Sequence, residues 1–161
     1  MTDSEGGRYR RNEGFFGADG QKAIARTPVA IVGAGGLGSH VIQQLGHLGA
    51  RSFALIDHDH VTDSSLNRVV TADDADVAAA TLKVDSARRR LLAINPTAQI
   101  TNVPTKLDDP AAYDALRRVA VVFGCVDNDY ARLELTRICS ALAIPLIDLA
   151  TDVDPKTTPM S

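Results

Sequence analysis

A glycine-rich turn between an apolar run and a helical pattern carries the clearest chemical signal in this sequence. Gly33, Gly35 and Gly38 have the spacing Gly-x-Gly-x-x-Gly, which permits a tight turn, a close approach of phosphate to the backbone and close helix-to-sheet packing. The amides of Gly36, Leu37 and the last of these glycines then lie at a helix start, where unpaired N–H groups attract an anion. The motif predicts a nucleotide site, but dinucleotide dehydrogenases and several unrelated nucleotide enzymes share it.

Charged residues further along the chain could complete such a site. Asp57 ends a second apolar run about 20 residues after the turn, where a carboxylate can accept both ribose hydroxyls; it could also simply cap a turn. Arg68 and Lys83 add two cations, and Asp127 follows a later apolar run. A dinucleotide needs little more than the helix start, so these additions favour a triphosphate with its magnesium, ATP rather than NAD. Taken singly, each cation could also be an ordinary surface residue.

Three other groups of residues point less strongly to a catalytic or metal-binding role. Asp127 and Asn128 are both good helix caps, a role that can coexist with metal binding. The run from Asp57 through His58 and Asp59 to His60 could be imagined as a metal cluster, but neighbours along an extended segment point in opposite directions. The two cysteines are read as small core residues; they have no metal spacing and indicate a reducing compartment.

The elements that must position these residues alternate between strands and helices. Such alternation predicts a doubly wound, mainly parallel Rossmann-like α/β sheet with helices on both faces. The polar residues named above follow strands, so they should converge at the carboxyl edge of the sheet. Strands are expected at 28–32, 53–57, 98–103, 119–124 and 145–149, and helices at 36–49, 81–94, 109–118 and from 127–129 onward.

The helical spacing also predicts which faces are buried. The expected buried residues are Val41, Leu45 and Leu48 in the first helix, Val84, Ala87, Leu91 and Ile94 in the second, and Ala131, Leu135, Ile138 and Leu142 in the last.

Two segments lack a strong pattern. Residues 1–18 are polar and glycine-rich, with Phe15 and Phe16 as the only large apolar groups, and indicate an arm docked at its end; a short helix capped by Asp19 would follow. The Asp-rich stretch 58–80 is expected to carry function or short turns of its own. We therefore expect an arm with a short helix over 1–26 and one nucleotide-binding domain over 27–161.

Composition excludes several classes of partner. A net charge of −3 argues against a general nucleic-acid or membrane-surface binder. The N-terminus lacks a signal-peptide pattern, and no apolar run is long enough to span a bilayer. A cytoplasmic protein is the expectation.

Read together, the motifs resemble the ThiF/MoeB/HesA family, the bacterial relatives of ubiquitin-activating enzymes. The resemblance covers nearly the whole chain in the family's order. It is carried by Arg-Tyr-Arg-Arg ending at Arg11, Phe-Gly-Ala-Asp-Gly-Gln over 16–21, the turn over 33–38, Asp57-x-Asp59-x-Val61, Ser-Ser-Leu-Asn-Arg over 64–68, Lys83, Ile-Asn-Pro over 94–96, and Asp127-Asn128.

The resemblance implies roles for these positions. Adenylation of a carboxylate is the implied reaction, acting on a small acid or on the C-terminus of a ubiquitin-like or sulfur-carrier protein, with a homodimer as the implied assembly. The glycine turn would hold phosphate and adenosine, and Asp57 the ribose, with Asp59, Ser65, Asn67 and Asn128 beside the nucleotide. Arg68 and Lys83 would hold the triphosphate, Asp127 the magnesium, and Arg11 would reach into the partner's site.

The chain also departs from the family pattern. Ser65 stands where the family usually has an asparagine, and it is a shorter hydrogen-bonding group. The sequence ends at Ser161, before the part that normally carries further strands, much of the dimer contact and often a zinc-binding cysteine pair. The chain is therefore expected to be a nucleotide-binding half. An NAD-dependent oxidoreductase domain and a non-catalytic nucleotide-binding or dimerisation module remain alternatives.

Overall fold

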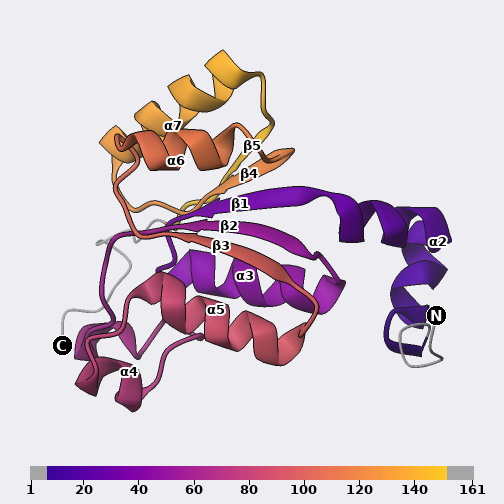
Figure 1. Ribbon diagram of the computed structural model, residues 1–161, viewed down its shortest axis with the longest axis horizontal. Coiled ribbons are helices and arrows are strands. Elements are labelled where there is room, and N and C mark those ends of the chain that lie inside the picture. The colour runs from indigo at the N-terminus through magenta and orange to yellow at the C-terminus, as the bar shows by residue number, and fades with distance from the viewer. Residues whose placement is uncertain (1–6, 152–161) are drawn as a thin grey trace, which may run out of the picture.

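The computed structural model describes residues 7–151 and shows a three-layer α/β architecture (Figure 1). Five parallel strands form one sheet in the order β3-β2-β1-β4-β5. The strands are β1 Pro28–Val32, β2 Ser52–Ile56, β3 Gln99–Val103, β4 Val121–Gly124 and β5 Leu146–Asp148. The expected doubly wound Rossmann-like fold is confirmed.

Helices cover both faces of the sheet. One core lies between the sheet and the helices α3 Gly36–Leu48 and α5 Lys83–Ile94, and the other beneath α6 Pro110–Leu116 and α7 Asp129–Leu142. The long connection after β2 contains a 3-10 turn, η1 Asp63–Ser65, and a short helix, α4 Asp74–Ala78. This connection thus has its own turns, as expected.

Local signals set most helix ends. Gly49 ends α3 in the left-handed conformation, with φ 98°, where its amide bonds to the carbonyls of Leu45 and Gly46. Asp109 caps α6 by accepting from the amide of Ala111, and Pro110 follows at the first helical position. These boundaries lie within a few residues of the expected ones.

The predicted face of the first helix is offset from the observed one. Val41, Leu45 and Leu48 are only half-buried, whereas Ile42 is fully buried. Gly46 explains the offset, because a Cβ there would lie 2.5 Å from Cδ1 of Leu91. A close contact between α3 and α5 therefore runs through a glycine, which an apolar pattern cannot reveal. On α5 the predicted buried face is confirmed for Val84, Ala87 and Leu91, and Ile94 is half-buried. On α7 the prediction is confirmed for Leu135, whereas Ala131, Ile138 and Leu142 are half-buried.

The N-terminal segment differs from the expected arm. The helix α2 spans Arg10–Arg26 and is broken only at Gly17, whose φ is 73°, so helix precedes as well as follows the break. Phe15 and Phe16 are 84% and 43% exposed and do not dock the segment. Other residues dock it: the side-chain amides of Asn12 and Gln21 donate to the carbonyl of Leu48 at 3.4 and 2.9 Å, and Ile24 packs against the core. The first six residues of the expected arm lie outside the described residues.

Candidate nucleotide-binding site

A cavity of about 640 Å³ lies at the carboxyl edge of the sheet. Its walls come from the segments that follow β1, β2, β3 and β4, together with the first turns of α3, α5 and α7. Segments distant in sequence meet there because the register aligns the last residues of adjacent strands, with Val32 opposite both Ile56 and Gly124. Of the predicted site residues, the cavity wall contains Gly33, Gly35, Gly36, Leu37, Asp57, Asp59, Arg68, Lys83, Asp127 and Asn128.

The glycine turn forms an open cradle at the start of α3. A Cβ on Gly38 would lie 1.8 Å from the carbonyl oxygen of Gly33, so the turn packs backbone against backbone. Gly33 has φ 91°, a conformation that favours glycine. A Cβ on Gly35, by contrast, would meet nothing within 4 Å. The space over Gly35 is therefore free for a ligand beside the helix start, which suits a phosphate group.

Asp57 is fixed by two backbone amides at the end of β2. Its Oδ2 accepts from the amide of Ala34 at 2.7 Å, and its Oδ1 accepts from the amide of Asp59 at 2.8 Å. The turn-capping role and a position in the cavity wall therefore coexist. Each carboxylate oxygen has a second lone pair, so the side chain can still accept hydroxyl groups.

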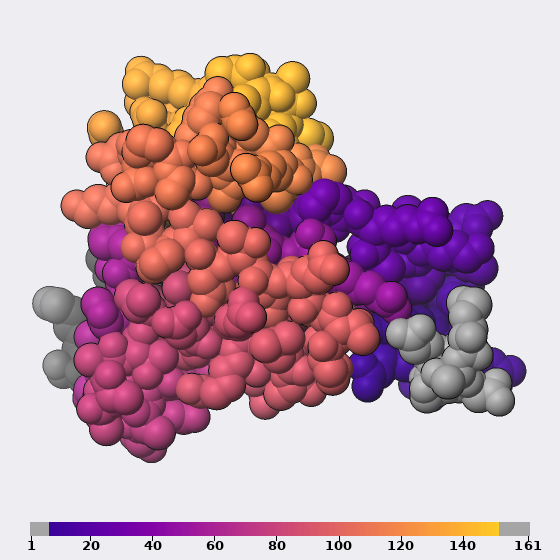
Figure 2. All heavy atoms as spheres, in the orientation of Figure 1, coloured from indigo at the N-terminus to yellow at the C-terminus, as the bar shows by residue number. Residues whose placement is uncertain are grey.

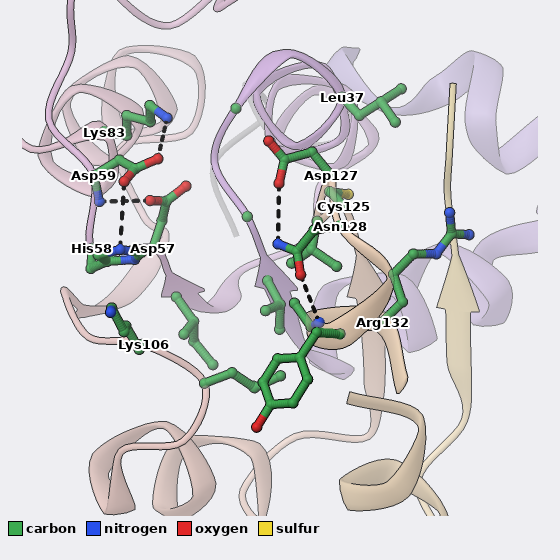
Figure 3. A pocket seen from close by; sticks show the side chains of 18 of the residues that line it. Leu37, Asp57, His58, Asp59, Lys83, Lys106, Cys125, Asp127, Asn128 and Arg132 are labelled. Atoms are coloured by element: carbon green, nitrogen blue, oxygen red, sulfur yellow. Dashed lines mark hydrogen bonds and ion pairs between the residues drawn. The ribbon is translucent and has the colours of Figure 1, made fainter. Parts of the chain in front are cut away.

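Lys83 and Asp59 form the charged wall beside Asp57 (Figure 3). The ammonium of Lys83 lies 2.7 Å from Oδ2 of Asp59, and its side chain is only 14% exposed. The hydrogen bond from Lys83 lowers the pKa of Asp59, and the positive charge of Lys83 adds to this effect. The backbone reinforces the contact, because the amide of Lys83 donates to the carbonyl of Asp59 at 2.9 Å.

The side chain of His58 also turns toward this group, contrary to the expected alternation. Its Nε2 lies 3.6 Å from Oδ1 of Asp59, and Asp57, His58 and Asp59 present possible ligand atoms within 4.8 Å of one another. The alternation fails because the hydrogen bond from the Asp59 amide to Asp57 bends the chain immediately after β2. Lys83 is the cation that Asp59 contacts in this structure.

Arg68 reaches the cavity from the connection between β2 and α4. Its aliphatic stem covers Gly36, where an added Cβ would lie 3.3 Å from Cδ of the arginine. Its guanidinium donates to the carbonyl of Ser64 and, at 3.1 Å, to the side-chain oxygen of Asn67.

Three predicted nucleotide contacts lie outside the cavity wall. Ser65 is buried, and its hydroxyl accepts from the amide of Thr62 at 3.2 Å, so it stabilises the turn that presents Arg68. Asn67 contacts Arg68, and Gly38 packs behind the turn.

Asp127 and Asn128 line the cavity on the other side of the glycine turn from Asp57. Asn128 caps α7 by accepting from the amide of Ala131 at 2.9 Å, and its Nδ2 donates to Oδ1 of Asp127 at 3.4 Å. Asp127 thus presents a carboxylate next to the cradle, a hard oxygen ligand of the kind magnesium prefers.

Arg11 lies far from this cavity. It belongs to α2, which contacts the carbonyl end of α3 through Gln21, at the edge where the strands begin (Figure 1). Arg8, just before α2, contacts the carbonyl end of α5 at the same edge. In the space-filling view α2, coloured indigo, projects from one side of the sheet domain (Figure 2). Arg11 therefore cannot act on a ligand in the cavity of its own chain.

The sequence reasoning did not single out several residues of the cavity wall. Lys106 and Thr105 follow β3, Tyr130 and Arg132 lie on α7, and the wall includes Cys125. Arg132 donates from Nε and NH2 to Oδ2 of Asp148, at 3.1 and 2.6 Å. An arginine on a helix surface has no distinctive sequence signal, and only the spatial pairing with β5 identifies this one.

The cysteines do not supply a nucleophile. Both are buried, as expected, and burial raises the pKa of the Cys125 thiol to about 11, with Asp148 contributing to the shift. A thiol with so high a pKa is almost entirely protonated at neutral pH, and only the thiolate is a good nucleophile.

Comparison with known proteins supports a common origin for this arrangement. A model of the ThiF family matches residues 9–154. The molybdopterin-synthase adenylyltransferase of Salmonella typhimurium is 38% identical over 149 residues, covering 91% of this chain and 59% of that protein. The sulfur carrier protein ThiS adenylyltransferase of Escherichia coli is 34% identical over 151 residues, with the same two coverages. The chain therefore spans about three fifths of these relatives.

A solved structure agrees with the fold. The E. coli tRNA N6-threonylcarbamoyladenosine dehydratase TcdA, in complex with ATP, superposes with a TM-score of 0.84 at 25% identity, covering 97% of this chain and 65% of that one. Within residues 7–151, no helix is both long enough and apolar enough to cross a membrane.

Proposed function

This chain belongs to the ThiF family, and we propose that it binds ATP with magnesium and adenylates a carboxylate. The observation that carries the proposal is the meeting of Lys83, Asp57 and Asp127 around the open cradle at Gly35. A dinucleotide site would not require the cation or the second carboxylate. TcdA has been solved with ATP, and the related E. coli protein MccB, which superposes with a TM-score of 0.73, has also been solved with ATP.

The residues present fit an ATP–magnesium group. The open space over Gly35 adjoins the start of α3, where a helix has unpaired backbone amides, which suits the phosphates. The fixed carboxylate of Asp57 suits the ribose hydroxyls. Lys83 and Arg68 would neutralise the triphosphate. Asp127 would hold magnesium, which when bound would draw charge from the phosphate oxygens.

The reaction needs positioning more than acid–base chemistry. The substrate carboxylate is already ionised at neutral pH, so it attacks the α-phosphorus without a general base. A bond forms between a carboxylate oxygen and the α-phosphorus as the bond from that phosphorus to the bridging oxygen of pyrophosphate breaks. The products are an acyl-adenylate and pyrophosphate, and the side chains of Lys83 and Arg68 stabilise the charge that accumulates on the leaving group.

The substrate and the assembly are part of the proposal. The named relatives are adenylyltransferases of molybdopterin synthase and of the sulfur carrier ThiS, which favours a small sulfur-carrier or ubiquitin-like protein as the source of the carboxylate. We also propose a cytoplasmic homodimer. Its supporting observation is Arg11, which can reach a nucleotide only in the site of a second copy because it lies at the opposite edge of its own sheet.

Nucleotide binding and exchange of pyrophosphate into ATP test this function. We expect calorimetry to show binding of MgATP and not of NAD, and a carrier protein ending in Gly-Gly to drive the exchange. Lys83→Ala and Asp127→Ala should each slow the exchange by about 10²–10³-fold, because each loses an electrostatic contact made with the reacting phosphates.

Matched controls come from the same helices. Arg90 is an exposed cation on α5 and Asp129 an acid in the first turn of α7, and neither belongs to the cavity wall. Arg90→Ala and Asp129→Ala should keep full exchange activity. Unchanged exchange in both site variants would contradict the assigned roles, and MgATP binding without exchange for any acid would favour a non-catalytic module.

A further inference from the structure

The strand order arranges the groups of the cavity in a line. From β3 to β4, the strand ends present first Thr105 and Lys106, then Asp57, then the glycine cradle, then Asp127. On the proposed function the first three positions correspond to the base, the ribose and the phosphates, and Asp127 would hold the metal beside the phosphates. The wall beside β5 remains without an assigned partner, and it is where a second substrate could enter.

Arg132 is the basic group of that wall. It lies on α7, one turn beyond Asn128, and forms part of the cavity lining (Figure 3). Its side chain is 30% exposed, so it is accessible without being fully solvated. Asp148 holds it from β5, whose pairing with β4 sets Asp148 opposite Gly124.

The contact with Asp148 orients the guanidinium and leaves donors available. Both hydrogen bonds go to one oxygen, Oδ2, and come from Nε and NH2 of Arg132. Its NH1 has no hydrogen-bond partner within the part of the chain that the structure describes. The planar guanidinium is therefore fixed on one side and can donate to another oxygen on the other.

We propose that Arg132, oriented by Asp148, binds the carboxylate that is adenylated and later the acyl oxygen of the adenylate. This inference rests on the proposed function and adds a substrate-positioning residue to it. The substrate carboxylate must approach the α-phosphate from the side away from the pyrophosphate. Lys83 and Arg68, which the proposed function assigns to the pyrophosphate, both come from the connection between β2 and β3. Arg132 comes from α7, between β4 and β5, and is therefore the cation of the cavity wall on the side away from that pair.

The paired arrangement suits a carboxylate that has to react. Asp148 offsets much of the positive charge of Arg132, so the guanidinium orients an incoming carboxylate without trapping it as a tightly paired ion. One donated hydrogen bond fixes one carboxylate oxygen and leaves the other free to attack the phosphorus.

Two adenosine compounds distinguish binding of the acyl group from binding of the nucleotide. The full chain is titrated with MgATP and with 5′-O-(N-glycylsulfamoyl)adenosine, a stable mimic of a glycyl-adenylate. In Arg132→Gln we expect the Kd of the mimic to rise about tenfold or more, the value of one charge-assisted hydrogen bond, while the Kd of MgATP stays within about twofold. Arg132→Lys keeps a cation beside Asp148, protects the fold, and should also bind the mimic more weakly.

Arg137 provides the matched control, since it lies on the same helix, is 67% exposed and is not part of the cavity wall. Arg137→Gln should bind both compounds like the wild type. Equal affinity of the wild type, Arg132→Gln and Arg132→Lys for the mimic would overturn the inference, as would an equal loss for both compounds. Failure of the wild type to bind MgATP would instead overturn the proposed function.

Discussion

Among single residues, location relative to the cavity separates side chains with identical chemistry. Lys83 and Arg90 are both cations on α5, yet the first is held at 2.7 Å by Asp59 in the cavity wall and the second is exposed on the helix surface. The sequence could identify Lys83 because it begins a helix that follows Asp57 and Asp59 along the chain. Arg132 could not be identified in this way, because its partner Asp148 is fixed only by the pairing of β4 with β5.

Gly35 offers a test of the phosphate cradle that leaves the fold intact. Its φ is −73° and a Cβ would meet no atom within 4 Å, so Gly35→Ala should keep the wild-type melting temperature. The added methyl group would stand where a phosphate must approach, and the affinity for MgATP measured by calorimetry should fall at least about tenfold. Gly14→Ala, which also adds a methyl group in open space, should not change the affinity. Wild-type affinity in Gly35→Ala would place the phosphates elsewhere.

Among the elements, those with local signals at their ends could be predicted and those defined by tertiary contact could not. Gly49 after α3, Asn95 and Pro96 after α5, and Pro110 at the start of α6 mark boundaries by backbone chemistry alone. The first half of α2 carries no comparable signal, since it buries no apolar face and its Asn12 side chain docks on the carbonyl of Leu48.

The residue after α7 has a strained backbone conformation, and a substitution can remove the strain. Ala143 occupies the left-handed region, with φ 53°, directly after the helix. Because glycine adopts this conformation without a Cβ clash, Ala143→Gly should raise the free energy of unfolding by about 0.5–1 kcal/mol in urea titrations. Ala141→Gly, inside the helix, should lower it by about 1 kcal/mol. Destabilisation by both substitutions to the same extent would show that residue 143 is not strained.

An ion pair fixes α4 on α5 and should make stability depend on pH. Asp76 is buried, and its oxygens accept from Arg89 at 2.6 and 2.7 Å; these bonds lower the pKa of the carboxyl group. A lowered pKa stabilises the fold above the unfolded value of about 3.9, and the contribution is lost as pH falls through the folded value.

Arg89→Met removes the cation of this pair. At pH 7 it should lower the free energy of unfolding by about 2 kcal/mol, less than for a fully buried pair because Arg89 is half-exposed. The difference from the wild type should shrink in urea titrations as the pH falls below about 3.9 and through the lowered pKa of Asp76, where the wild-type carboxyl group becomes protonated. Arg90→Met, on the exposed side of α5, is the control. A pH-independent difference would mean that Arg89 stabilises by packing alone.

For the whole molecule, the separation of Arg11 from its own cavity makes shared sites testable. Arg11→Ala and Asp127→Ala should each be nearly inactive in pyrophosphate exchange. A mixture of the two contains heterodimers in which one site has both an intact Asp127 and an intact Arg11 from the neighbour, so activity should partly return. Mixing Arg11→Ala with wild type measures subunit exchange. Failure of the two variants to complement, with exchange demonstrated, would exclude a contribution of Arg11 in trans.

The position of the first strand has a consequence for how the chain is made. Because β1 lies in the middle of the sheet, synthesis up to Val103 can complete one flank, β3-β2-β1 with α3 and α5, before β4 has been translated. The nascent intermediate would expose the open side of β1 and one bare sheet face, a surface prone to aggregation. Ribosome pauses at which β3 has left the exit tunnel and β4 is still inside it should therefore increase the demand for chaperones more than pauses after β5 has emerged.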